Sequence, residues 1–204
     1  MRSFTSDMAV DVPEGGHGAV TVERFTIGTD DFQNFRMGGR AARPGTYTML
    51  CRKGELWMSD TTAERMDHFE AAREIDARGG RILIGGLGLG MILRVALLTP
   101  KVAHIDVVEI DPDVIALVGP HYQAMAAARG KSLSIIQADL TTVKWPPQTR
   151  WDVAWFDIWP DLCTDALDSM AALRRSYGRR ADWCECWGRE WLLDRRRREK
   201  RMGW

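Results

Sequence analysis

The chain has 204 residues, of which 45% are hydrophobic and 27% are charged, and its formal net charge is zero. This composition is ordinary for a globular protein and supplies enough apolar side chains for one core. No apolar run reaches the roughly 18–20 residues that a membrane-spanning helix needs, which excludes a membrane protein of that kind. The first residues contain acids and lack the apolar segment of a secretory signal, so we expect a cytoplasmic protein.

The zero net charge conceals an asymmetry along the chain. From Met170 to Trp204 there are eleven Lys and Arg residues against five Asp and Glu residues, a net charge of +6, which leaves −6 on the rest. The four cysteines are scattered, and the Cys184-x-Cys186 pair lacks the second pair of ligands that a zinc site needs. We therefore expect reduced thiols and no bound metal.

The N-terminal part of the chain predicts a small β unit. Residues 1–17 are rich in Gly, Asp and Glu and predict a flexible leader. The next stretches predict a strand at 20–27, a loop rich in Gly and Arg at 28–45, and a hairpin over 46–59 that turns at Gly54. We interpret 18–60 as a small β appendage and 61–204 as the main domain.

The main domain alternates helices and strands, each predicted from the spacing of its apolar residues and from the Gly, Pro or Asp at its ends. The predicted helices cover about 62–77, 88–98, the stretch that opens at Asp111-Pro112, and the stretch between Thr164 and Gly178. The predicted strands cover 81–84, 103–110, 133–137 and 151–156, with a short strand favoured at 181–187 before a basic C-terminal helix. This alternation predicts an α/β fold with a Rossmann-like, doubly wound, mainly parallel sheet.

A glycine-rich loop joins the first predicted strand of this domain to its helix. The stretch RILIGGLGLGMIL, residues 81–93, contains Gly85, Gly86, Gly88 and Gly90. Glycine lets the backbone turn sharply and touch a ligand, although a tight turn without a ligand is the alternative interpretation. The frame is G-x-G-x-G and not the G-x-G-x-x-G of dinucleotide sites, which favours an adenosyl ligand without a pyrophosphate over NAD.

Acids end three successive strands, at the edge of the sheet where ligands bind in this fold class. Glu109 follows Gly86 by 23 residues, a spacing typical of the carboxylate that accepts hydrogen bonds from two ribose hydroxyls. Asp139 is placed for an adenine amino group, and Asp157 ends the next strand. Each could also be an exposed loop acid, and Asp111 fits a helix cap.

Four stretches together resemble one superfamily. IGGLGLG, VVEIDPDVI, IIQAD and WDVAWFD resemble the class I S-adenosylmethionine-dependent methyltransferases, and within them the spermidine synthase-like proteins. Those proteins also have a small N-terminal β domain and a His-Glu signature before the first sheet strand, near which Asp67-His68-Phe69-Glu70 stands here. The resemblance covers roughly residues 45–160, and 47 residues follow Asp157, which implies a compact form truncated after the fifth strand.

The resemblance implies a cofactor and site residues. The cofactor would be S-adenosyl-L-methionine or decarboxylated S-adenosylmethionine. Gly85, Gly86, Gly88 and Gly90 would line its methionine and ribose part, and Glu109 would hold the ribose. Ala138 and Asp139 would face the adenine. Asp157 would lie beside the sulfonium, where it activates an amine nucleophile or only positions the cofactor.

The chain also departs from its relatives. Ile84 and Gly88 stand where ordinary methyltransferases and spermidine synthases, respectively, keep an acid for the cofactor's amino group. The amine-binding D-S-S-D-P motif is replaced by D-I-W-P-D, of which only Asp157 is in register. We therefore expect a methyltransferase acting on a small amine or other nucleophile. The alternatives are an aminopropyltransferase, a non-catalytic adenosyl-binding protein and, last, an NAD-dependent oxidoreductase.

The remaining expectations concern partners. The basic tail could contact nucleic-acid phosphates, but a solvated helix surface is favoured, since the Asp/Asn-Pro-Pro-aromatic motif of amino-methyltransferases is absent after residue 156. The small-molecule acceptor is the main partner expected. Trp183, Trp187 and Trp191 favour a core or subunit interface over a base-stacking platform. A short sheet with an exposed edge strand predicts a homodimer.

Overall fold

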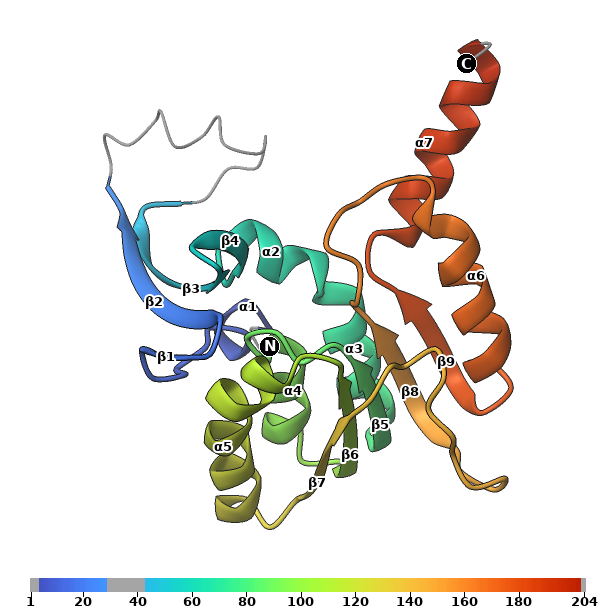
Figure 1. Cartoon of the computed structure of the whole chain (residues 1–204). Coiled ribbons are helices and arrows are strands. Elements are labelled where there is room, and N and C mark those ends of the chain that lie inside the picture. Colours follow the sequence, from blue (N-terminus) through green and yellow to red (C-terminus); the bar gives the residue numbers. More distant parts are fainter. Residues whose placement is uncertain (1–3, 29–42, 203–204) are drawn as a thin grey trace.

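The computed structural model describes residues 4–28 and 43–202, so most of the predicted loop over 28–45 lies outside the described residues. Two sheets form the framework (Figure 1). A four-stranded antiparallel sheet has the order β1-β2-β3-β4, and a five-stranded parallel sheet has the order β7-β6-β5-β8-β9. None of the helices in these two ranges is both long enough and apolar enough to cross a membrane.

The antiparallel sheet contains β1 (Gly15–His17), β2 (Val20–Ile27), β3 (Gly45–Arg52) and β4 (Glu55–Ser59). Strands β3 and β4 form the predicted hairpin, and its two-residue turn is Lys53-Gly54 with positive φ at both residues. Asp113 at the start of α5 accepts hydrogen bonds from Ala19 N and His17 Nδ1, at 3.0 and 3.2 Å. This contact attaches the small sheet to the main domain.

The parallel sheet contains β5 (Gly80–Gly85), β6 (Val102–Glu109), β7 (Ser132–Gln137), β8 (Trp151–Phe156) and β9 (Ala181–Cys186). Chain order places β5 in the centre, the next two strands on one side, and the last two on the other. After β7 the chain therefore crosses to the other side of β5, where β8 and β9 are added. The carboxyl ends of β5 and β8 meet at this topological switch point. This topology confirms the predicted Rossmann-like α/β fold.

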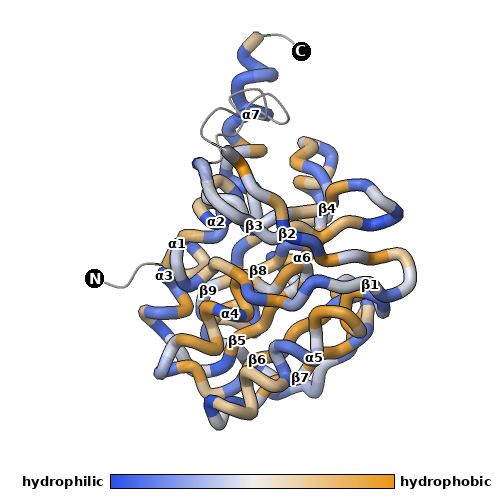
Figure 2. Tube along the Cα trace, turned by 90° about the vertical axis from the view of Figure 1, so that its left-hand side faces the viewer, coloured by the Kyte–Doolittle hydropathy of each residue, from blue (hydrophilic) through white to orange (hydrophobic). Residues whose placement is uncertain are grey.

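Helices cover both faces of the parallel sheet (Figure 1). The helices before and between the first strands are α2 (Thr62–Asp67), α3 (Phe69–Arg78), α4 (Met91–Leu98) and α5 (Pro112–Ala128). The last two are α6 (Ala166–Tyr177) and α7 (Arg189–Met202). Buried residues of α3, α4 and α5 form one core with Ile82, Ile84 and Val107, and α6 forms the second core with Leu83, Ala154 and Phe156. In Figure 2 the central strands and α4 are mainly hydrophobic, whereas α7 is hydrophilic.

Two local predictions differ from the structure. Residues 4–14 are not a flexible leader: α1 (Phe4–Asp7) is followed by Met8 and Val12, which are fully buried, and Val10 N donates to Asp60 Oδ2 at 2.9 Å. The composition of this stretch is polar, but three apolar side chains suffice to attach it to the core. The single helix predicted at 62–77 is broken at His68, which separates α2 from α3.

A buried carboxylate links the amino-terminal ends of three parallel strands. Asp106 is 3% exposed. Its Oδ2 accepts hydrogen bonds from Arg81 Nε at 2.9 Å and Trp151 Nε1 at 2.8 Å, and His104 Nε2 lies 2.8 Å from its Oδ1. Each strand thereby contributes one side chain to the same carboxyl group.

We expect Asp106→Asn to lower the free energy of unfolding by about 2 kcal/mol, because hydrogen bonds to a buried charge contribute about 1.5–3 kcal/mol. Urea unfolding monitored by circular dichroism measures the change. Asp182→Asn is the matched control, since Asp182 pairs with Arg150 at 3.3 Å on the surface and its side chain is 56% exposed. That variant should change stability by less than about 0.5 kcal/mol. Equal effects of the two substitutions would contradict the prediction.

Candidate functional site

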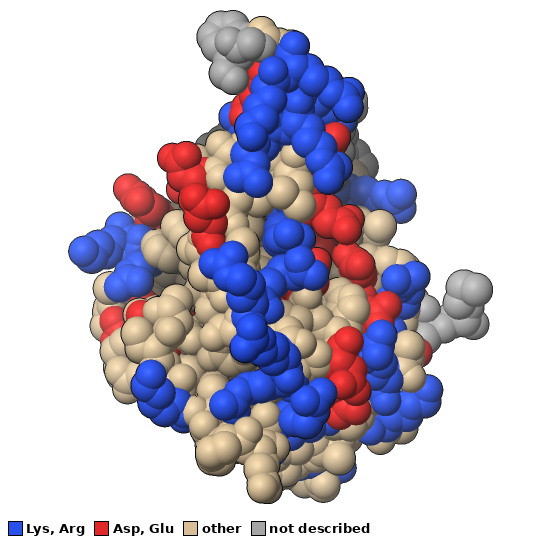
Figure 3. All heavy atoms as spheres, turned by 90° about the vertical axis from the view of Figure 1, so that its right-hand side faces the viewer, with Lys and Arg blue, Asp and Glu red and all other residues tan. Residues whose placement is uncertain are grey.

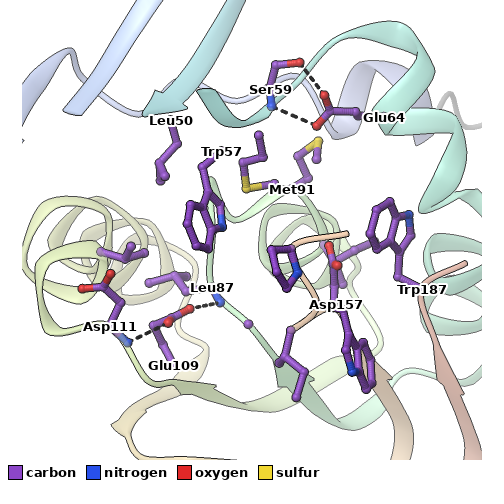
Figure 4. A pocket seen from close by; sticks show the side chains of 18 of the residues that line it. Leu50, Trp57, Ser59, Glu64, Leu87, Met91, Glu109, Asp111, Asp157 and Trp187 are labelled. Carbon is purple, nitrogen blue, oxygen red and sulfur yellow. Dashed lines mark hydrogen bonds between the residues drawn. The ribbon is translucent and has the colours of Figure 1, made fainter. Parts of the chain in front are cut away.

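A cavity of about 690 Å³ opens at the carboxyl edge of the parallel sheet, between that edge and the small antiparallel sheet. Its walls come from the glycine loop, the ends of β6, β7 and β8, helix α2, and the hairpin of β3 and β4. The volume falls in the range of about 300–1,000 Å³ that is usual for small-molecule sites. Figure 4 shows Glu109 and Asp111 on one side of this cavity and Asp157 and Trp187 on the other.

The glycine loop, residues 85–90, turns from β5 into α4 with positive φ at Gly86, Gly88 and Gly90. A Cβ at Gly86 would collide with the carbonyl oxygen of Asp157, and one at Gly90 would collide with the Tyr122 ring. At Gly88 the neighbour is the Met58 sulfur, which also accepts a hydrogen bond from Leu89 N at 3.3 Å. The glycines therefore allow the loop to pack closely against β8, α5 and β4, while Gly86 and Gly88 still line the cavity.

We expect Gly88→Ala to lower the free energy of unfolding by about 2 kcal/mol. Alanine in the left-handed region costs about 1–2 kcal/mol, and the Met58 side chain must also move. Gly130→Ala is the control, because Gly130 has φ +62 and a Cβ at this position would meet no atom within 4 Å, so only the backbone cost remains. Thermal unfolding of both variants checks the difference, and a loss at Gly88 that is equal to or smaller than that at Gly130 would contradict the Met58 contact.

Glu109, at the end of β6, holds two neighbouring loops. Its Oε2 accepts a hydrogen bond from Leu87 N at 2.7 Å, and its Oε1 accepts one from Asp111 N at 2.8 Å (Figure 4). Glu109 is 9% exposed and lines the cavity. Because each carboxylate oxygen has two lone pairs, both can accept a further hydrogen bond from the cavity side. Asp111 caps α5 through Asp113 N, as predicted, and pairs with Arg52 at 2.7 Å.

Asp157 follows β8 and faces α2 across the cavity. Its side chain is 24% exposed, and its Oδ2 lies 3.7 Å from His68 Nε2. The break between α2 and α3 at His68 directs this imidazole at the strand end. Burial, together with the charges of Glu64 and Asp67, raises the pKa of Asp157 to about 7. A carboxyl group with this pKa can accept or release a proton at neutral pH.

The wall around Asp157 is acidic and aromatic. Glu64 accepts hydrogen bonds from Ser59 N and Oγ at 2.8 and 2.7 Å, and Asp67 accepts one from Trp187 Nε1 at 3.3 Å. Trp155, Trp159 and Trp187 line the cavity on the same wall, whereas Trp57 lies beneath Arg52, whose guanidinium is 5.5 Å from its ring centroid. Carboxylates and indole faces both attract cations, so this half of the cavity suits a positively charged ligand.

The structure brings six of the eight predicted site residues to the cavity. Its lining includes Gly86, Gly88, Glu109, Ala138, Asp139 and Asp157. Gly85 and Gly90 stand outside the lining and pack against Leu140 and Tyr122, respectively. Asp139 accepts two hydrogen bonds from Thr141, from its hydroxyl and its backbone N–H, and these lower the pKa of Asp139. Its carboxylate is therefore ionised at neutral pH.

Several lining residues had no signal in the sequence. Met58 and Trp57 belong to the hairpin assigned to the appendage, and Glu64 fits a polar position of a surface helix, whereas Asp67 belongs to the stretch noted near the His-Glu signature. They reach the cavity because the small sheet and α2 fold over the carboxyl edge of the parallel sheet. The three tryptophans considered together in the sequence also separate: Trp183 stacks on Trp155, Trp187 lines the cavity, and Trp191 on α7 is exposed. A strand at 181–186 places these rings on different elements.

Comparisons with known proteins give weak likenesses. No protein-family model matches the sequence, and no curated protein matches it. Among solved structures, the methyltransferase domain of bacterial CtHen1-C is similar at 15% identity over 53% of this chain and 56% of that chain, with a TM-score of 0.42. The pyocyanin biosynthetic protein PhzM is similar at 19% identity over 59% and 34% of the two chains, with a TM-score of 0.43.

Spermidine synthase from Thermotoga maritima is similar at 18% identity over 64% of this chain and 41% of that chain, with a TM-score of 0.39. The matched part thus spans between about a third and just over a half of these three solved chains. Such low values carry no conclusion about activity. The Rossmann-like fold of this protein rests on the strand order of its own parallel sheet.

Proposed function

We propose that this protein binds S-adenosyl-L-methionine in the cavity and transfers its methyl group to a small amine. The observation that carries the proposal is the meeting, in one cavity, of the glycine loop, Glu109 and Asp157. The sequence resemblance to class I methyltransferases supports the same cofactor. The residues also fit its charges, since the sulfonium is a cation and the Asp157 half of the cavity is acidic and aromatic.

Each part of the cofactor has a counterpart among the residues described. Glu109 would accept the ribose hydroxyls, and Ala138 and Asp139 would face the adenine. The amino-terminal end of α4, which begins at Met91, lines the cavity and offers backbone N–H groups to the carboxylate. Glu64 and Asp67, across the cavity from the glycine loop, would supply the negative charge that the loop lacks at Ile84 and Gly88.

The chain's own residues support a direct transfer. Bound S-adenosylmethionine supplies a methyl group made electrophilic by its sulfonium. Asp157 accepts the proton that the attacking amine must lose, and Glu64 and Asp67 hold the amine by charge. With cofactor and amine bound, the lining tryptophans would limit the access of water to Asp157. In the transfer the amine nitrogen would bond to the methyl carbon, the cofactor sulfur would keep the electron pair of the broken bond, and the Asp157 carboxylate would take the proton.

Isothermal titration calorimetry tests the proposal at its first step. We expect S-adenosylmethionine and S-adenosylhomocysteine to bind with micromolar dissociation constants, and NADH to bind at least about a hundredfold more weakly, because no G-x-G-x-x-G loop is present for its pyrophosphate. Mass spectrometry of the ligand retained on purification gives an independent readout. Absence of binding of both adenosyl compounds and of methylthioadenosine would refute the proposal, and NADH binding in their place would favour an oxidoreductase.

Aminopropyl transfer is the second candidate, and one observation favours it. Arg52 is the only Lys or Arg among the described lining residues, and it already pairs with Asp111 at 2.7 Å. Decarboxylated S-adenosylmethionine has no carboxylate and would therefore need no Lys or Arg side chain to bind it. Supplying decarboxylated S-adenosylmethionine with putrescine and measuring methylthioadenosine discriminates between the two transfers. Binding of either cofactor without turnover on any amine would instead indicate a non-catalytic adenosyl-binding protein.

A further inference from the structure

A strip of exposed cations runs along the face of the molecule that carries α6 and α7. Figure 3 shows Lys and Arg gathered over α7 and continuing as a stripe down this face. We call six residues the basic strip: Arg175, Arg179 and Arg180 at the end of α6, and Arg197, Lys200 and Arg201 on α7. Five of the six are exposed, and Arg180 is partly so.

The basic strip keeps its charge available for a partner. Within residues 4–28 and 43–202, no ion pair joins any of its six members to an acid, although Arg180 donates to the Pro146 carbonyl at 2.8 Å. Three of the nearby acids are already paired with other arginines. On α7, Asp194 pairs with Arg198 and Glu199 pairs with Arg195, and below it Asp182 pairs with Arg150.

The shape of the basic strip is linear. Helix α7 continues outward from the carboxyl end of β9 and projects beyond the body of the protein (Figure 1). Arg180 directly precedes β9, and Arg201 is near the end of α7. At about 3.3 Å per residue in the strand and about 1.5 Å per residue in the helix, the two elements end to end span at most roughly 40 Å. At about 3.4 Å per nucleotide, this length matches about 12 base pairs of duplex.

We infer that the basic strip is a docking surface for the phosphate backbone of a nucleic acid. Charge complementarity supports this occupant, since a row of cations without acidic partners attracts a polyanion. An anionic membrane fits less well. Arg197, Lys200 and Arg201 are spaced i, i+3 and i+4 and so lie on one face of α7, as a row of phosphate contacts requires. The helix has few apolar residues, and Leu192 is buried, so it offers no continuous apolar face for insertion into a membrane. The surface is separate from the adenosyl cavity, so this binding does not depend on the activity proposed above.

Fluorescence anisotropy of the full chain with a labelled 20-base-pair duplex DNA and a labelled 20-nucleotide RNA tests the inference. We expect dissociation constants of about 1–100 µM at physiological salt and a steep loss of affinity with added salt. Six phosphate contacts predict a slope of about −5 for log K against log salt on duplex DNA, at about −0.9 per contact. No binding of either nucleic acid at 50 mM NaCl would overturn the proposal.

Two double variants with equal changes of net charge distinguish binding at the basic strip from a general effect of net charge on affinity. Arg175→Glu with Arg179→Glu should weaken binding at least tenfold and reduce the slope by about 2, because two contacts are lost. Arg24→Glu with Arg129→Glu, on exposed positions elsewhere, should change affinity less than threefold. Circular dichroism confirms that both fold. Equal losses in the two variants would overturn the proposal, as would binding to phosphatidylserine vesicles with no binding to nucleic acid.

Discussion

Replacing Glu109 with alanine should weaken the binding of S-adenosylmethionine at least about a hundredfold. The substitution removes the acceptor for Leu87 N and Asp111 N, so both loops lose the bond that fixes them. It also removes the acceptor proposed for the ribose hydroxyls. Hydrogen bonds to a charged group contribute about 1.5–3 kcal/mol each, and the loss of two such bonds exceeds the roughly 2.7 kcal/mol of a hundredfold change. Isothermal titration calorimetry with S-adenosylmethionine measures the loss of affinity.

Two further variants decide what Glu109 does. Glu109→Gln keeps one oxygen for Leu87 N but turns its amide N–H₂ toward a second donor, so an intermediate loss of affinity is expected. Glu23→Ala, an exposed acid on β2 outside the cavity lining, removes the same charge and should leave affinity unchanged. If Glu109→Ala lowers the unfolding temperature but binds the cofactor like the wild type, Glu109 only organises the loops.

The sequence predicted the parallel sheet well because its signals are local. Apolar runs bounded by Gly, Pro or Asp specify strands and helices over a few residues, and the order of these elements restricts the topology. The same locality explains why Gly86, Glu109 and Asp157 were found: each lies at or directly after the end of a strand, and the ends of parallel strands meet at one edge.

The other half of the cavity depends on contacts between distant segments. Met58 reaches the glycine loop 31 residues further along, and Trp187 reaches Asp67 across 120 residues. Periodicity cannot reveal such pairs, because each residue fits its own element equally well without the partner. The break at His68 escaped prediction for the same reason, since the apolar spacing of 62–77 continues through it and the imidazole faces Asp157 only after folding.

Replacing Asp157 with asparagine should reduce methyl transfer by about 10²–10⁴-fold while the affinity for S-adenosylmethionine changes less than threefold. That range is typical for the loss of a general base, and asparagine keeps the shape of the side chain without its proton affinity. Formation of S-adenosylhomocysteine with a panel of primary amines measures the rate. In the wild type the rate should rise with pH, reach half of its maximum near pH 7, where Asp157 is half ionised, and level off above that pH. Asp161→Asn, an exposed acid in the same loop, is the control.

The same substitution has a second expected result, which can be measured without a methyl-accepting substrate. Because burial raises the pKa of Asp157 to about 7, the folded state holds a proton that the unfolded state, in which the carboxyl has its ordinary pKa of 3.8, has released. The stability that this proton contributes is full below pH 3.8 and is lost as pH rises through about 7. Between pH 5 and pH 8 the free energy of unfolding of the wild type should therefore fall by about 2 kcal/mol, whereas that of Asp157→Asn should not show this fall. The figure follows from about 1.4 kcal/mol per pH unit, reduced because the side chain is partly exposed. Urea unfolding at both pH values measures this difference, and parallel pH dependence of the two proteins would show that Asp157 ionises normally and is no base poised for neutral pH.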